Sequence, residues 1–353
     1  FFTAFIIGGC ISLGGIIFLN PLARFLGATD TILPFARDYL GFILLGAPFM
    51  VSSLLLNNLF RFQGSAFLGM LGMVSGAVLN IGLDPLFIFG LGMGIKGASL
   101  ATMISQTTSC LLLLAICFRG GETIPIRLRN FRPSPGRYAD IARGGTPSLF
   151  RQSLMSLSMI LLNRAAGFYG DAVIAAISIV TRVVMMINSA VLGLGQGFQP
   201  VCGFNYGARR YARVKRAFWF CVRLTTVLLC VLALGSFIFA PRIIALFRRD
   251  DPEVIRIGAL ALRFQSCVIP LGGWIVLNNM MLQTMGKAFP ASLLAFSRQG
   301  LFLIPLLFTL VPLLGVTGIQ LCNPIADFCT FLLALPLGIH TLRRDLGGGQ
   351  TGC

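Results

Sequence analysis

The residues best suited to chemistry in this chain are an amide and a carboxyl one helical turn apart in an apolar stretch. Asn80 and Asp84 are four positions apart and therefore share one face of a helix. Pro85 follows, and because proline has no amide hydrogen it leaves the carbonyl of Ile81 without its donor in the helix. These oxygens suit a hard cation such as Na⁺, or a proton carried on the carboxyl. Alternatively, Asp84 reaches the membrane interface or caps a neighbouring helix.

A second pair of charges lies in the C-terminal half. Arg298 and Asp327 carry opposite charges and fall on consecutive apolar stretches, which run antiparallel if both cross a membrane. They either form an ion pair that pins two helices together, or provide a second coupling site at which Asp327 changes its protonation. The only histidine, His340, has no evident partner, and the ten cysteines show no metal-ligand spacing. We therefore expect no catalytic residues, and the only metal we expect is a coupling Na⁺.

The elements that must position these residues are membrane spans. Of the 353 residues 56% are hydrophobic and 11% are charged, against about 25% charged in soluble proteins. Apolar runs of about twenty residues recur, long enough to cross a hydrocarbon core about 30 Å thick, and they lack the alternation of barrel strands. The sequence thus predicts an all-α polytopic membrane protein and excludes a soluble enzyme. We expect ten spans, at 1–20, 40–60, 67–90, 97–118, 144–168, 172–195, 217–240, 257–283, 288–312 and 316–341.

The formal net charge of +17 indicates orientation in a membrane protein, whereas in a soluble protein it would suggest nucleic acid. Basic residues gather in 119–151, in 209–216 and at 343–344. If two spans separate each group from the next, all three groups lie on the same side of the membrane. The positive-inside rule places that side in the cytoplasm. We expect lipid bilayer around the chain and no nucleic-acid partner.

An internal repeat indicates two lobes. Residues 56–58, 64–67 and 94–97 recur as 277–279, 286–289 and 315–318, at an offset of 221 or 222. We therefore expect an N-lobe at 1–118, a basic cytoplasmic linker at 119–143 and a C-lobe at 144–353. On this offset residue 1 aligns with residue 222, so the sequence predicts a six-plus-six protein in which two N-terminal helices precede this chain. An even number of helices per repeat places the pseudo-two-fold axis along the membrane normal.

Longer motifs resemble the multidrug and toxic compound extrusion (MATE) family of transporters, and within it the MepA-like subgroup. Residues 79–85 with 97–102 resemble the family's fifth and sixth helices, and 298–305 with 324–327 resemble its last two. The stretch 195–209 resembles the loop after the eighth helix, and its motif residues are Gln196, Gln199, Pro200, Asn205, Tyr206 and Gly207. The resemblance implies twelve helices in two lobes, of which this chain holds the third to the twelfth.

The resemblance also implies a function and a site. It implies a monomeric secondary antiporter of the plasma membrane, in bacteria the cytoplasmic membrane. Such an antiporter exports lipophilic, often cationic, compounds in exchange for Na⁺ or H⁺ and needs no other cofactor. Asn80, Asp84 and Thr102 match three members of the implied ion site, and the fourth, an Asp on the first helix, falls outside this sequence.

Two alternative functions stay open. A flippase for lipid-linked oligosaccharides would need several intramembrane arginines for the pyrophosphate, and few are present. A membrane-embedded transferase acting on isoprenoid phosphates would need clustered aspartates for Mg²⁺, and no span contains DxxD or DxxxD.

Overall fold

The chain is an all-α multi-pass membrane protein. The computed structural model describes residues 1–25, 33–119, 134–248 and 251–344, and within these ranges every regular element is helical. Among these described residues, eight helices are long and apolar enough to cross a membrane, and nine are if one bent pair counts as a span. The helix that covers the expected span at 144–168 is not among these nine. Together with that helix, α6 (Pro135–Gly167), the nine candidate spans are compatible with the ten expected from the sequence.

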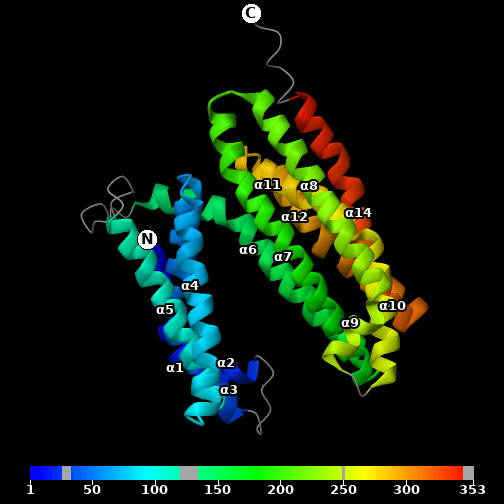
Figure 1. The fold of residues 1–353 in the computed structure, drawn as a ribbon, viewed down its shortest axis with the longest axis horizontal. Helices are drawn as coiled ribbons and strands as arrows, with labels where there is room; N and C mark the ends of the chain where they lie inside the picture. The colour runs from blue at the N-terminus through cyan, green and yellow to red at the C-terminus, as the bar shows by residue number, and fades with distance from the viewer. Residues whose placement is uncertain (26–32, 120–133, 249–250, 345–353) are drawn as a thin grey trace, which may run out of the picture. The chain divides into compact units, whose positions relative to one another are not determined.

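The chain forms two compact units, Phe1–Pro133 and Ser134–Cys353. Unit 1, blue to cyan in Figure 1, contains α1 (Phe2–Ile17), α2 (Leu19–Phe25), α3 (Leu33–Phe62), α4 (Ala66–Pro85), a π-helical turn η1 (Leu86–Gly90) and α5 (Ile95–Arg119). Most of the expected linker, residues 120–133, lies outside the described residues. The last part of the expected linker, 135–143, belongs to the first helix of unit 2, which begins at Pro135.

Close contacts between small residues hold unit 1 together. Helix α5 packs against α3 and α4, and a Cβ atom added to Gly76 of α4 would collide with Ser109 of α5. The Ser109 hydroxyl donates to the backbone carbonyl of Gly72 (2.5 Å). Because lipid tails provide little hydrophobic drive between helices, such small-residue contacts are the usual means of association in membranes. They fix α4 against α5.

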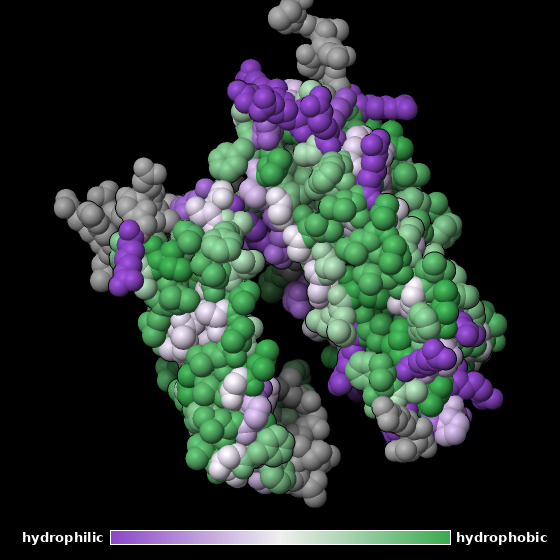
Figure 2. Space-filling view, viewed as in Figure 1, coloured by the Kyte–Doolittle hydropathy of each residue, from purple (hydrophilic) through white to green (hydrophobic). Residues whose placement is uncertain are grey.

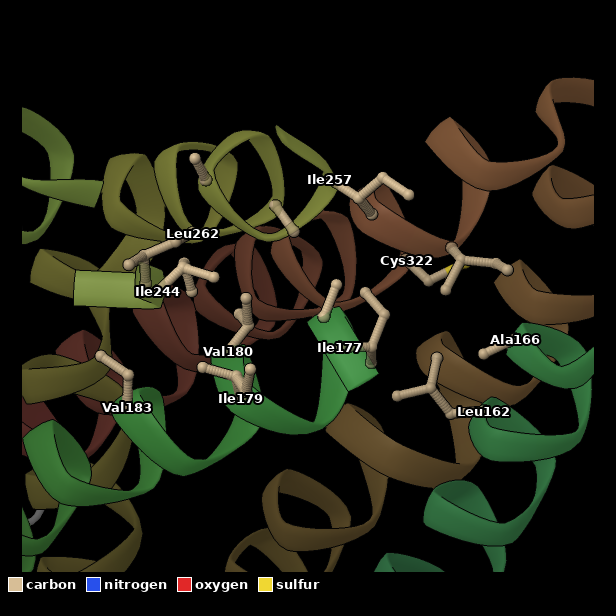
Figure 3. Close-up of a cluster of buried hydrophobic side chains, with 14 of the residues drawn as sticks. Leu162, Ala166, Ile177, Ile179, Val180, Val183, Ile244, Ile257, Leu262 and Cys322 are labelled. Carbon is tan, nitrogen blue, oxygen red and sulfur yellow. The ribbon is translucent and has the colours of Figure 1, made fainter. Parts of the chain in front are cut away.

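Unit 2 contains the remaining helices, coloured green to red in Figure 1. They are α6 (Pro135–Gly167), α7 (Asp171–Gly207), α8 (Tyr211–Ile238), α9 (Ala240–Phe247), α10 (Pro252–Val268), the 3₁₀ turn η3 (Ile269–Leu271), α11 (Gly272–Thr284), α12 (Ala288–Phe296), the π-helical turn η4 (Ser297–Leu303), α13 (Ile304–Leu314) and α14 (Val316–Arg344). In one core, Ile177 and Val180 of α7 lie near Leu262 of α10 and Cys322 of α14 (Figure 3). This core fixes α7, α10 and α14 relative to one another.

The repeat read from the sequence has a structural counterpart. In each unit a long helical segment, a segment broken by a π-helical turn and another long helix follow in order. The glycines that join them share a positive φ, which is 83° and 74° at Gly64 and Gly286, and 56° and 59° at Gly94 and Gly315. Glycine is favoured there because other residues have a Cβ that clashes at positive φ. These turns are therefore what the repeated glycines encode.

Two expected elements differ in the structure. The span expected at 1–20 breaks at Phe18, after which α2 turns by 89°. The stretch 195–207, expected to be a loop, is the C-terminal part of α7. It stays helical because Phe198 and Cys202, four positions apart, are both buried on one helix face. The turn that follows includes Arg209 at a φ of 57°.

Candidate functional site

The structure brings Asn80 and Asp84 into direct contact on α4. The Nδ2 of Asn80 donates a hydrogen bond to Oδ1 of Asp84 (3.2 Å), and both side chains are half-buried. Because Asn80 donates through its nitrogen, its own carbonyl oxygen remains an acceptor. The two residues thus present amide and carboxylate oxygens on one helix face, a donor set that suits an alkali cation or a proton.

A π-helical turn follows this pair directly. Helix α4 ends at Pro85, and η1 continues the same membrane segment to Gly90. A Cβ at Gly97 of α5 would lie 2.8 Å from the carbonyl carbon of Phe87, so α5 packs closely against the turn. Pro85 removes a backbone donor, and π-helical turns frequently occur at functional sites. The carboxyl of Asp84 therefore stands at an irregular and closely packed point of the helix.

Thr102 lies on the neighbouring helix α5 and is half-buried. Its hydroxyl donates to the backbone carbonyl of Ala98 (2.9 Å), and within the described ranges it forms no hydrogen bond to Asn80 or Asp84. The lone pairs of the Thr102 oxygen stay available as acceptors. The structure thus joins two of the three expected ion-site residues by a hydrogen bond and leaves the third unconnected to them.

Arg298 and Asp327 form an ion pair in unit 2. The Nε of Arg298 lies 2.5 Å from Oδ1 of Asp327, and its Nη2 donates to Oδ2 (3.2 Å). The side chain of Asp327 is 13% exposed and that of Arg298 is 36% exposed. A bidentate pair of this kind combines charge with a fixed geometry. It connects η4 to α14.

Sequence reasoning missed a third member of this cluster, Gln265 of α10. Its Nε2 donates to Oδ2 of Asp327 (2.7 Å), and the residue is 4% exposed. About two turns earlier on α14, Gln320 donates to the backbone carbonyl of Ile257 of α10 (3.0 Å). The signal was present as two amide side chains inside apolar runs, since a buried amide in a membrane helix needs a partner.

The motif residues at the end of α7 build a helix terminus. Gln196 is exposed, and Gln199 and Pro200 are half-buried. Asn205 donates to the backbone carbonyl of Val201 (2.8 Å). The rings of Tyr206 and Tyr211 lie 5.7 Å apart, and Gly207 is the last residue of the helix. This stretch forms the connection from α7 to α8.

The described ranges contain no group of three or more His, Cys, Asp and Glu side chains that could hold a metal ion. The Asn80–Asp84 pair provides a single carboxylate. Its oxygens are better suited to a weakly and reversibly bound cation than to a permanently bound metal ion.

Comparison with known proteins places the chain in a family. The model of the MatE family matches residues 1–86 and 147–309. The chain belongs to the MatE family. It is a multi-pass membrane protein, which in bacteria resides in the cytoplasmic membrane, and it is not an enzyme.

Individual relatives agree with this assignment. The multidrug export protein MepA of Staphylococcus aureus strain MSSA476 is 28% identical over 352 residues, which cover 98% of this chain and 77% of that protein. MepA of Staphylococcus haemolyticus strain JCSC1435 is 28% identical over 345 residues, which cover 98% of this chain and 75% of that protein.

Solved structures share the fold over nearly the whole chain. A multidrug resistance MATE transporter of the MOP superfamily, in an outward-facing conformation, has a TM-score of 0.90 at 26% identity, over 98% of this chain and 77% of that one. A MOP superfamily transporter from Pyrococcus furiosus, described as having a binding pocket of reverse polarity that suggests a different function, has a TM-score of 0.90 at 27% identity, over 98% and 78%.

Proposed function

We propose that this protein is a secondary active antiporter. It exports lipophilic or cationic toxic compounds in exchange for Na⁺ or H⁺ by alternating access, and it functions as a monomer. The observation that carries the proposal is the Asn80–Asp84 hydrogen bond inside a membrane segment of a MatE family member. Relatives named as multidrug export proteins support the substrate class.

Asp84 holds the exchangeable charge in this proposal. Asn80 is its hydrogen-bond partner, and the backbone carbonyl that Pro85 leaves without a donor supplies a further oxygen. Thr102 joins the site through its hydroxyl oxygen when the coupling ion is bound. Binding of a cation or a proton removes the net charge of Asp84, which changes the relative stability of the conformations that the transporter alternates between.

Asp327 and Arg298 have a structural role in this proposal. Three donors hold the Asp327 carboxylate, one from Gln265 and two from Arg298. Neutralising Asp327 would leave Arg298 without its counter-charge, whereas the described contact of Asp84 is one hydrogen bond from a neutral amide. The C-terminal pair therefore pins α10, η4 and α14 together.

The same pair disfavours the flippase alternative. A site for a lipid-linked pyrophosphate needs arginines with open donors, and Arg298 already gives two of its nitrogens to Asp327. Transport of a cationic dye and of a pyrophosphate-linked lipid, measured side by side, separates the two functions.

The test of coupling is Asp84→Asn in the full-length transporter, reconstituted in proteoliposomes with imposed Na⁺ or H⁺ gradients. Asn keeps the size of the side chain but cannot ionise, so we expect gradient-driven dye transport to fall to background while the thermal stability is retained. Asp38→Asn is the matched control, because its carboxylate is paired with Lys96 in an exposed position of the same unit. Unchanged gradient-driven transport in Asp84→Asn would contradict the proposal.

A further inference from the structure

One end of unit 2, which we call the basic end, carries an unbalanced cluster of positive charge. The segments 196–219 and 334–344 contain no acidic residue, and Asp345, which follows, lies outside the described residues. The cluster comprises the basic residues of the α7–α8 turn, of the start of α8 and of the last turn of α14: Arg209, Arg210, Arg213, Lys215, Arg216, Arg343 and Arg344. All of them are exposed except Lys215, which is half-buried.

These basic residues belong to one surface. Val214 of α8, Leu342 of α14 and Cys202 of α7 are all buried in the same core cluster, so the three helix ends pack together. The hydrophilic side chains gather at the end of unit 2 where α7 meets α8 and α14 ends (Figure 2). The charges therefore form a continuous patch across two chain segments that are far apart in sequence.

The opposite end of unit 2 differs in charge. There Asp251 lies 3.8 Å from Arg248 and caps the N-terminus of α10 by accepting from the backbone of Glu253 (3.2 Å) and Val254 (3.3 Å). Acidic side chains thus accompany the basic ones at that end. At the basic end no described carboxylate accompanies the positive charges, and this difference from the opposite end is a feature to explain.

Aromatic side chains border the basic end on the membrane side. Tyr206 and Tyr211 stand at the turn, and Trp219, which is 44% exposed, lies 5.7 Å from the ring of Trp274. Trp219 is eight residues after Tyr211, or about 12 Å along α8. Tyrosine and tryptophan favour the depth of the lipid headgroups. Basic side chains next to such aromatic residues are therefore expected at the depth of the lipid phosphates.

We propose that the basic end of unit 2 binds the headgroups of anionic phospholipids. The guanidinium groups of the α7–α8 turn and of the end of α14 contact the phosphates of the surrounding leaflet, and shared lipids tie these two segments together. This inference does not depend on the transported substrate. It predicts that anionic lipid stabilises the protein in proportion to the charge of this surface.

The test compares lipids on the purified full-length protein in a neutral detergent. We expect added phosphatidylglycerol to raise the Tm by several degrees more than phosphatidylcholine does, and salt to reduce the difference. The combined substitution Arg210→Gln, Arg213→Gln and Arg216→Gln should remove most of it. Inorganic phosphate at equal ionic strength should not reproduce it, which separates a lipid surface from a phosphate site.

Two further variants complete the experiment. Arg242→Gln, Arg248→Gln and Arg256→Gln remove three exposed charges near the opposite end of unit 2 and should leave the effect of phosphatidylglycerol intact. Changing Arg210, Arg213 and Arg216 to Lys preserves the charge and should retain the effect even if the Gln variant does not fold. Equal shifts with both lipids, an undiminished shift in the Gln variant, or the same loss in both Gln variants would overturn the inference.

Discussion

At the residue scale, two membrane carboxyls differ in what surrounds them. Asp327 accepts from Arg298 and from the buried amide of Gln265, so its charge is balanced and its position fixed. Asp84 accepts from the neutral amide of Asn80. An unbalanced carboxylate in a membrane segment is unfavourable by up to about 3 kcal/mol on insertion scales. A bound cation or proton relieves that cost, and this difference makes Asp84 the better candidate for coupling.

The C-terminal pair leads to a stability prediction. Arg298→Leu leaves the largely buried carboxylate of Asp327 without its cationic partner. We therefore expect the free energy of unfolding to fall by an amount on the order of 3 kcal/mol. The double variant Arg298→Leu and Asp327→Leu removes both charges and should recover most of that stability. Thermal or denaturant unfolding in detergent micelles measures both. If the double variant is no more stable than the single one, the pair does more than balance charge.

At the element scale, glycines decide how closely helices approach. A Cβ at Gly76 would collide with Ser109, whereas nothing lies within 4 Å of a Cβ at Gly82 on the same helix. Gly76 therefore contributes to the α4–α5 contact that supports Asp84. Gly82 takes no part in a close helix contact, so a larger side chain fits there.

This contrast gives a paired prediction for α4. Gly76→Val should destabilise the protein by about 1–3 kcal/mol through overpacking, because the backbone of α5 must move. Gly82→Ala should be neutral or slightly stabilising, because alanine is the better helix former. Thermal unfolding of the two variants in the same detergent tests the difference, and equal losses would mean that the close contact is not limiting.

At the scale of the whole molecule, the distribution of charge predicts the orientation in the membrane. The 37-residue helix α7 runs from Asp171 to Gly207 and is followed by Ala208 at the basic end. Phe168, which is 89% exposed, lies three residues before its start. At about 1.5 Å per residue the helix is long enough to cross the bilayer. We expect the Ala208 end to face the cytoplasm because of its arginines.

Cysteine labelling in intact cells measures this orientation. In a background without native cysteines, a membrane-impermeant thiol reagent should modify Phe168→Cys and spare Ala208→Cys. Permeabilised cells should show both modified, which controls for accessibility. Labelling of Ala208→Cys from outside would reverse the orientation for all the basic groups.

The sequence by itself determined the class, the repeat and the residues worth testing. The length of the hydrophobic runs predicts membrane helices because the thickness of the hydrocarbon core sets the length of a spanning helix. The paired glycines mark the turns with positive φ at Gly64 and Gly286. The spacing of Asn80 and Asp84 predicts a shared face because four residues make about one helical turn. These are local properties of the chain.

Only the tertiary structure decided which distant groups meet. Gln265 and Asp327 are 62 positions apart, and nothing in either local sequence specifies their 2.7 Å hydrogen bond. The extension of α7 through Gly207 also depends on packing. Glycine and Pro200 disfavour a helix, and burial of Phe198 and Cys202 overrides that preference. Local propensity is worth tenths of a kcal/mol per residue, whereas burying a large side chain is worth about 1.5–3 kcal/mol, so packing decides such segments.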